Sequence, residues 1–277
     1  MRTLKYIFFI SVVVGFTVYA IIDIFFPNGF FGDDEEDNKP KKTALNIGAP
    51  NSISSLPVWV AEEDSIFDSL QVDITVKHFT DQLDCDMAFV KGKINLSISD
   101  QERVEWMKKK YDVKYNELRR LPYPYSIVAN RKARITKFTQ LKDKMLAVTR
   151  HSTYAKAAQH CIDSVKMKSD SVYIVQINNP NVALLMLQNN EMDASFLPEP
   201  YVIMAKKMGH NTIFTSFTEA LLIGNTENKS DDMRKFNLAY DEALKRIRKN
   251  GLKHYTELIA RRCKCQTDFE GELKVKF

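Results

Sequence analysis

The chain has 277 residues, of which 44% are hydrophobic and 27% are charged, with a formal net charge of +5. This composition excludes a largely disordered chain and allows one large or two modest domains with real cores. Its basic clusters, at Lys108–Lys110, Arg131–Arg134 and Lys245–Lys249, contain no interleaved aromatic residues, which argues against a nucleic-acid-binding protein. They are typical of solvated faces, with an anionic ligand as the open alternative.

The amino-terminal stretch has the pattern of a membrane anchor. Arg2 and Lys5 precede an apolar run that starts at Tyr6 and continues past Asp23, about 20 residues that are enough to cross a bilayer. We expect a transmembrane helix within residues 1–30 and a flexible charged tether at 31–43. The positive charge before the run places the body outside the cytoplasm, on a single-pass protein of the cytoplasmic membrane. A signal peptide cleaved near Ala20 is the alternative.

The folded body is predicted to start with a strand at Ala44–Ala49 and a loop rich in serine. The loop contains Ser54 and Ser55 and leads into a helix with Pro57 in its first turn and Trp59 further on. A helix that starts after such a loop offers free backbone N–H groups and hydroxyls at the end of a strand. This arrangement suits a polar group of a ligand, and simple capping of the helix by serine is the alternative.

Two stretches of the chain share one order of elements. In Gln82–Asp100 and again in Asn178–Tyr201, an apolar helix is followed by a tight turn, a short buried strand and an acidic residue. Asp100 ends the first strand, and Glu199 follows the second strand between two prolines, which cannot donate to a ladder. Because ligands bind at the carboxyl ends of strands in open α/β sheets, we expect both acids to face one cleft.

Further polar and aromatic residues follow other predicted strands. The segment Leu121–Tyr125 is stiffened by proline, and we expect it to cross between two lobes and to offer Tyr123 or Tyr125 to the cleft, with packing of these tyrosines at the hinge as the alternative. A strand that ends at Val148 leads to Arg150, Ser152 and Thr153 and then into a helix. Ser152 or Thr153 is suited to cap this helix, whose dipole, together with Arg150, favours an anionic group. An ordinary cap with a solvated arginine is the alternative.

The remaining predicted elements complete an α/β body. We expect strands at Val113–Leu118, Ser126–Asn130, Val172–Ile177, Thr212–Phe217 and Ala220–Asn225, and amphipathic helices at Met233–Asn250 and His254–Arg262. The four cysteines, Cys85, Cys161, Cys263 and Cys265, are too few and too irregularly spaced for a disulfide framework, and no histidines stand at zinc spacing. We therefore expect no metal site, with one long-range disulfide as the alternative in an oxidising compartment.

From Ala44 to Arg262 the chain resembles the type 2 periplasmic substrate-binding proteins of ABC transporters, in the branch that serves nitrate, sulfonates, taurine and thiamine precursors. The resemblance is carried by NIGAP (46–50), FVKGKINLSISD (89–100), FTQLKDKMLAVTRHST (138–153) and MLQNNEMDASFLPEPYVIMAKKMG (186–209). Asn95, Lys144 and Asn190 depart from the family pattern, and the lipid-carrying cysteine of many relatives is missing.

The resemblance implies an α/β fold of two lobes with a central cleft, joined by two crossover strands. The first lobe would comprise residues 44–128 and 214–277, and the second lobe residues 129–213. It also implies that the body delivers one small polar solute to an ABC permease in the inner membrane, without catalysis and without a cofactor. An enzyme on the same fold, resembling thiamine-pyrimidine synthases or chorismate-processing lyases, and a ligand-sensing module of a membrane complex are the alternatives.

The expected ligand-binding residues come from both lobes, and some of them follow from the resemblance alone. They are Ser54, Ser55, Trp59, Asp100, Tyr123, Arg150, Ser152, Thr153, Glu199 and Tyr201. The sequence leaves the charge of the solute open, because Arg150 beside a helix amino terminus favours an anion, whereas Asp100 and Glu199 favour a cation.

Overall fold

The computed structural model describes residues 45–166, 168, 171–225, 231–265, 273 and 275–277. The predicted membrane helix within residues 1–30 and the predicted tether at 31–43 lie outside these residues. Within the described ranges, no helix combines the length and the apolar character that a bilayer crossing needs.

Eight strands form one mixed sheet among the described residues, in the order β2-β1-β3-β8-β4-β7-β5-β6. The strands β2, β1 and β3 are parallel at one end of this order, and β7, β5 and β6 are parallel at the other. Between them, β8 and β4 are antiparallel to each other and to their outer neighbours. The strand bounds are β1 Leu45–Pro50, β2 Ile74–Phe79, β3 Leu96–Asp100, β4 Tyr115–Ala129, β5 Met145–Val148, β6 Tyr173–Gln176, β7 Ala194–Pro198 and β8 Asn211–Asn225.

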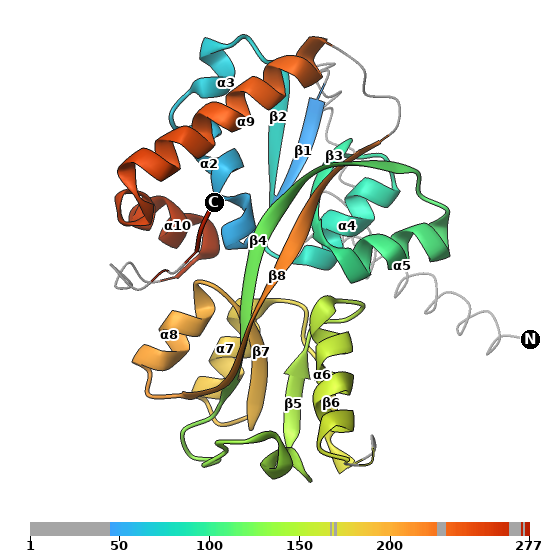
Figure 1. The fold of residues 1–277 in the computed structure, drawn as a ribbon, viewed down its shortest axis with the longest axis vertical. Helices are drawn as coiled ribbons and strands as arrows, with labels where there is room; N and C mark the ends of the chain where they lie inside the picture. Colours follow the sequence, from blue (N-terminus) through green and yellow to red (C-terminus); the bar gives the residue numbers. More distant parts are fainter. Residues whose placement is uncertain (1–44, 167, 169–170, 226–230, 266–272, 274) are drawn as a thin grey trace, which may run out of the picture. The chain divides into compact units, whose positions relative to one another are not determined.

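Two lobes are built on the two parallel ends of the sheet, which confirms the predicted two-lobed α/β architecture (Figure 1). We call the part around β2, β1 and β3 the first lobe and the part around β7, β5 and β6 the second lobe. The helices of the first lobe are η1 Ile53–Ser55, α2 Leu56–Glu63, α3 Ile66–Ser69, α4 Gln82–Val90, α5 Gln101–Tyr111, α9 Asp231–Asn250, η4 Leu252–Tyr255 and α10 Thr256–Cys263. Those of the second lobe are η2 Phe138–Leu141, α6 Thr153–Ser164, α7 Pro180–Gln188 and α8 Tyr201–Lys207.

Helices cover both faces of each parallel group of strands. In the first lobe, α9 packs against α2 and α3, with the rings of Phe67 and Phe236 stacked at 6.0 Å, while α4 and α5 pack together beside β3. All residues of β3 and β7 are therefore buried, as expected for strands with helices on both sides. The tightly packed lobes hold the strand ends, and the polar residues that follow them, in fixed positions.

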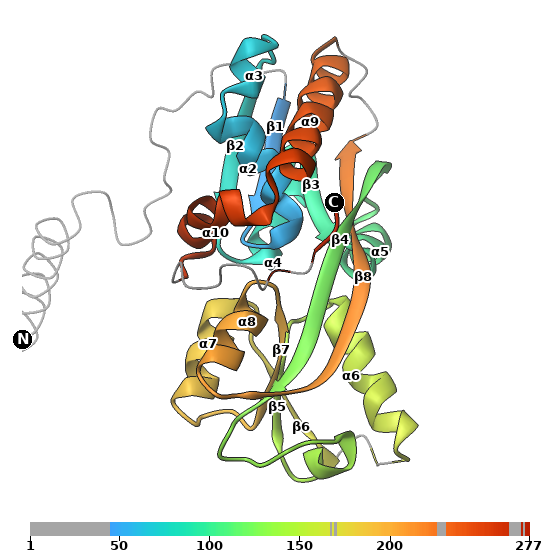
Figure 2. The same ribbon diagram turned by 60° about the vertical axis from the view of Figure 1, so that its left-hand side comes forward.

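Two long strands, β4 and β8, connect the lobes (Figure 2). The sequence predicts four shorter strands in these regions, and this prediction is wrong. The first two predicted strands form the single strand β4, and the last two form the single strand β8. The strand β4 continues through Pro122 and Pro124, although neither proline can donate to a ladder. Pairing with β7 begins only at Tyr125, so both prolines lie where the antiparallel partner of β4 is β8.

The repeated helix–turn–strand unit of the sequence is present in both lobes, as α4 with β3 and as α7 with β7. Side-chain caps start both helices: Asp81 Oδ1 accepts the N–H of Leu83 at 2.8 Å, and Asn179 Oδ1 accepts the N–H of Asn181 at 2.9 Å. Asp100 is the last residue of β3 and also caps α5, since its Oδ1 accepts the N–H of Arg103 at 3.2 Å. A buried carboxylate thus stands at the carboxyl end of a strand, where the two lobes meet.

Candidate functional site

A small cavity lies between the two lobes, at the carboxyl ends of the parallel strands. Its volume is about 30 Å³, and residues of both lobes and of β4 line it: Pro50, Asn51, Ser52, Thr80, Gln82, Tyr123, Thr149, Tyr154, Asn178, Pro180 and Pro198. This space holds about one or two water molecules, whereas pockets for small molecules typically measure roughly 300–1,000 Å³. The lobes are therefore closed, and a solute larger than water enters only when they separate.

Asp100 forms the direct polar contact between the first lobe and the amino terminus of α6 in the second lobe. Both the N–H and the Oγ1 hydroxyl of Thr153 donate to Asp100 Oδ1, each at 3.0 Å. The next two amides, of Tyr154 and Ala155, donate to Ser152 Oγ at 3.2 and 3.4 Å. The free amides that usually make a helix amino terminus attractive to an anion are thus used by the chain itself.

Behind this contact lies a buried cluster of two acids and one arginine. Arg103 Nη1 lies 3.0 Å from Asp86 Oδ2, and Arg103 Nε lies 3.4 Å from Asp100 Oδ2. All three residues are at least 98% buried, since their exposed fractions are 0%, 0% and 2% for Asp86, Arg103 and Asp100. Ser99 Oγ and Gln82 Nε2 also donate to Asp86 Oδ1, at 2.8 and 3.0 Å.

Burial has the largest effect on the pKa of each of these two acids. It raises the pKa of Asp86 to about 6, although the charge of Arg103 and the hydrogen bonds from Ser99 and Gln82 oppose the shift. Burial also raises the pKa of Asp100, against the charge of Arg103 and the hydrogen bonds from Arg103 and Thr153. The sequence reasoning missed Asp86 and Arg103; the available signals were an acid in an apolar helix and an arginine three residues after Asp100.

Aromatic side chains form one wall of the cavity. The predicted cleft residue Tyr123 lines it and stacks on Tyr154, with ring centroids 5.6 Å apart and an interplanar angle of 9°. The ring of Tyr154 also lies 5.7 Å from that of Phe196. Burial raises the pKa of both tyrosine hydroxyls, so they remain protonated and are able to donate. Tyr154 was not among the predicted ligand residues because it appeared to be an ordinary helix residue.

Of the ten predicted ligand residues, only Tyr123 is among the residues that line the cavity in this conformation. Asp100, Ser152 and Thr153 form the contact beside it, and four others are held in the surrounding walls. Ser54 Oγ donates to the carbonyl of Pro122 at 2.6 Å, and Ser55 Oγ donates to that of Pro50 at 2.7 Å. Trp59 is fully buried in the core, and the hydroxyl of Tyr201 donates to the carbonyl of Cys263 at 2.9 Å. These side chains hold the walls of the cleft, and Asn51 and Ser52 line the cavity in the place of the later serines.

The two charged residues expected at the second lobe's strand ends are also outside the cavity lining. Arg150 is exposed, and its backbone N–H donates to Asn178 Oδ1 at 3.1 Å. Glu199 is half-buried in the turn between β7 and α8, and its N–H donates to the carbonyl of Pro124 at 3.4 Å. The cavity is therefore lined by uncharged side chains.

Contacts between the lobes also close both rims of the cleft. On the side of α5 and α6, Lys156 Nζ lies 2.6 Å from Glu102 Oε1, and the rings of Trp106 and His151 stack at 4.3 Å. On the opposite side, where α7 and α8 approach the end of α10, Asn181 Nδ2 donates to the carbonyl of Cys263 at 3.3 Å, beside the hydrogen bond from Tyr201.

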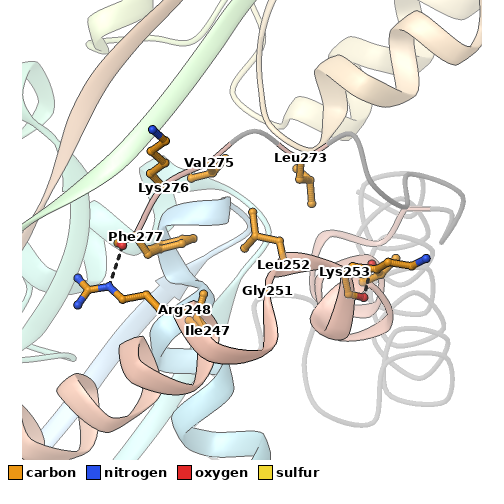
Figure 3. Close-up of a pocket in the computed structure, with 10 residues that line it drawn as sticks. Ile247, Arg248, Gly251, Leu252, Lys253, Leu273, Val275, Lys276 and Phe277 are labelled. Carbon is orange, nitrogen blue, oxygen red and sulfur yellow. Dashed lines mark hydrogen bonds between the residues drawn. The ribbon is translucent and has the colours of Figure 1, made fainter.

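A larger cavity, of about 490 Å³, lies at the end of α9 within the first lobe (Figure 3). Ile247, Leu252 and Phe277 are among its lining residues, and Arg248 Nε donates to the carbonyl oxygen of Phe277 at 2.9 Å. None of the predicted ligand residues lines this space. A pocket of about 500 Å³ lies between α5 and α6, with Ser152 and Lys156 among its lining residues. Tyr123 lines the small interlobe cavity.

A sequence model described as NMT1/THI5 like matches residues 52–250, which is more than half of the chain. The chain belongs to this family. The match runs from the loop that follows β1 to the end of α9 and so includes the second lobe, both connecting strands and most of the first lobe. No curated protein matches this NMT1/THI5-like chain in sequence.

Solved structures that resemble this family member have the fold of type 2 periplasmic binding proteins. The alkanesulfonate-binding protein SsuA from Xanthomonas axonopodis pv. citri, bound to MOPS, superposes with a TM-score of 0.68 at 12% identity, over 80% of each chain. The periplasmic nitrate-binding protein NrtA from Synechocystis gives 0.69 at 12% identity, over 82% of this chain and 69% of that one. A Candida albicans protein with the generic periplasmic binding protein fold gives 0.65 at 13% identity, over 81% and 78%. At these identities the likeness shows the fold.

The raised pKa of Asp86 predicts a pH-dependent stability. Between the ordinary aspartate value of 3.8 and about 6, the folded protein binds a proton at Asp86 that the unfolded chain has released. This contribution is fully present below about pH 4 and is lost as the pH rises to about 6. The free energy of unfolding in urea is measured for the wild type and for Asp86→Asn. The wild-type value minus the variant value should fall by about 2 kcal/mol as the pH rises across this window. A difference that stays constant between pH 4 and 6 would contradict the raised pKa.

The rim pair of Glu102 and Lys156 offers a test of lobe closure. Lys156→Glu places two carboxylates together and should separate the α5 and α6 rims, although the pair is partly exposed and contributes only about 1 kcal/mol or less. The chain has two tryptophans, and Trp59 is fully buried, so acrylamide quenching reports on Trp106. Quenching should increase in Lys156→Glu and return to the wild-type value in the double variant with Glu102→Lys. Equal quenching in all three proteins would show that this pair does not hold the rim.

Proposed function

We propose that this protein is the extracytoplasmic solute-binding component of an ABC-type uptake system. Its lobes would close by a hinge motion around one small polar solute and present it to a permease in the inner membrane. The observation that carries the proposal is the cavity between two lobes, lined from both of them and bounded by contacts at both rims. The names of the structural neighbours SsuA and NrtA, an alkanesulfonate-binding and a nitrate-binding protein, support it.

We further propose the division of the body that such a motion requires. The first lobe comprises residues 44–128 and 214–277, the second lobe comprises residues 129–213, and β4 and β8 act as the hinge. The pairing of these strands shifts register between Glu117 and Arg119 and between Ile127 and Val128, and such irregularities bend and twist a ribbon locally.

The predicted site residues take different parts in this proposal. Tyr123 contacts the solute, while Asp100, Ser152 and Thr153 form the wall where the lobes meet. Arg150 and Glu199 approach the solute at the mouth of the cleft as the lobes separate. The other four residues act indirectly by holding the walls in place: Ser54, Ser55, Trp59 and Tyr201.

Binding without catalysis fits the state of the cysteines. All four are free, and burial raises the pKa of Cys85, Cys161 and Cys263. Because the thiolate is the nucleophilic form, buried and protonated thiols of this kind are inert.

Solute binding should protect the cleft against amide exchange. We expect slower hydrogen exchange at Thr149–Thr153 and Pro198–Tyr201 when the full chain meets its solute in a mixture of sulfonates, nitrate, thiamine precursors and amines. Helix α9 serves as the internal control, because it packs against α2 and α3 and none of its residues lines the interlobe cavity, so it should exchange at an unchanged rate. Unaltered exchange at both cleft segments with a broad mixture of polar metabolites would count against the proposed function.

We propose that the amino-terminal segment anchors this body to the cytoplasmic membrane. The proposal rests on the basic residues Arg2 and Lys5 before an apolar run of membrane-spanning length. The full chain should sediment with membranes and resist extraction by alkaline carbonate. Release of a shorter chain that starts beyond Ala20 would instead establish the cleaved signal peptide.

A further inference from the structure

The amino terminus of α6 is occupied by the protein's own carboxylate. Thr153 gives both its N–H and its hydroxyl to Asp100 Oδ1 at 3.0 Å, and the amides that follow are bound by Ser152 Oγ. For the lobes to close on an anion at this helix end, the anion would have to take the place of Asp100, which is itself held by Arg103 through its Nε at 3.4 Å and its backbone N–H at 3.2 Å.

The charge of the buried cluster also disfavours an anion. Arg103 supplies one positive charge to the two carboxyl groups of Asp86 and Asp100. With both carboxyls ionised the cluster carries one net negative charge, and with one of them protonated it is neutral. Arg103 therefore has no positive charge left to offer to a bound anion, and a negative ligand nearby would be repelled at short range in a medium that screens weakly.

The lining of the cavity offers no other counter-ion. Its side chains are hydroxyls, carboxamides, prolines and phenols, and none of them carries a charge. The basic residue Arg150, which follows β5, is exposed and outside the lining, and Lys109, Lys110 and Lys156 line a separate pocket between α5 and α6. Burying an ion among uncharged groups without a partner is costly, whereas a neutral molecule can form hydrogen bonds with the hydroxyls and carboxamides of the lining.

We propose that the cleft takes a small uncharged polar solute and excludes anions such as sulfonates and nitrate, because Asp100 fills the anion-binding end of α6. The inference rests on the proposed solute-binding function and narrows its ligand class. In this respect the chain departs from SsuA and NrtA, whose names describe an alkanesulfonate-binding and a nitrate-binding protein.

Matched probes separate charge from shape in the test. Methanesulfonate and methanesulfonamide have nearly the same shape and differ in charge. Nitrate is tested as a second anion, and small amides and sulfones are tested as further uncharged compounds. The full-length protein is melted with each compound at equal ionic strength, with sodium chloride as the reference. Wild type should be stabilised by at least one uncharged compound and by neither anion, with a rise of about 5 to 10 °C at roughly hundredfold excess over the dissociation constant.

The variant Asp100→Ser removes the internal carboxylate and keeps a good cap for α5. It should free the N–H and hydroxyl of Thr153 and leave Arg103 paired with Asp86 alone, so methanesulfonate or nitrate should now raise the melting temperature. Asp163→Asn is the matched control, because it also removes one negative charge, at an exposed side chain near the carboxyl end of α6 that accepts a hydrogen bond from Gln159, and should gain no anion binding. If Asp100→Ser does not fold, Asp100→Asn keeps the shape of the side chain and should show the same gain more weakly.

The outcomes distinguish this inference from the proposed function. Stabilisation of the wild type by methanesulfonate or nitrate would overturn the inference and leave the solute-binding function intact. A folded Asp100→Ser or Asp100→Asn protein that gains no anion binding would also overturn it, because Asp100 would not be the excluding group. If no compound of either class raises the melting temperature of the wild type or changes amide exchange at the cleft, the result would contradict the proposed solute-binding function itself.

Discussion

The carboxylate of Asp100 connects the parts of this molecule on which its closure depends. It ends β3, caps α5, lies beside Arg103 and accepts two hydrogen bonds from Thr153 across the cleft. A buried acid of this kind is costly unless its partners are in place. Separation of the lobes would withdraw the donors of Thr153 and admit water, so lobe position and the electrostatics of the buried cluster are coupled.

The two long strands β4 and β8 connect the lobes, so the lobes move relative to each other about these strands. Because β4 and β8 pair along their full lengths and pass between the lobes, they provide the covalent and hydrogen-bonded connection about which the lobes turn. The remaining interlobe contacts are few and mostly polar, with the ion pair of Glu102 and Lys156 on one rim and the carbonyl of Cys263 on the other. Polar rims of this kind are easily exchanged for water, which suits a cleft that opens and closes.

Family membership and fold do not identify the ligand of this protein, which depends on the residues of the site. Structures at 12% and 13% identity superpose on this chain with TM-scores of 0.65 to 0.69, which shows how little of the sequence the fold requires. The ligand class depends instead on a few groups at the strand ends. Here those groups are an internal carboxylate at a helix amino terminus and a lining without charge.

The sequence by itself determined the local units. Caps and hydrophobic periodicity act within a few residues, so the helices after Asp81, Ser152 and Asn179 and the buried strands β3 and β7 were predictable from short stretches. Because several motifs resemble those of one family, the arrangement of these units in two lobes was also predicted. The two connecting strands were predicted as four pieces, since Pro122 and Pro124 normally end a strand and the pairing that tolerates them comes from β8, far away in the chain.

Only the tertiary structure decided what the polar residues do. Asp86 meets Arg103 across 17 positions and Asp100 meets Thr153 across 53, and no local pattern contains such distances. The sequence placed an acid and a helix amino terminus at one cleft and left open whether they attract a cation or an anion. The fold brings them into contact with each other, so Asp100 and the amino terminus of α6 are hydrogen-bonding partners within the protein.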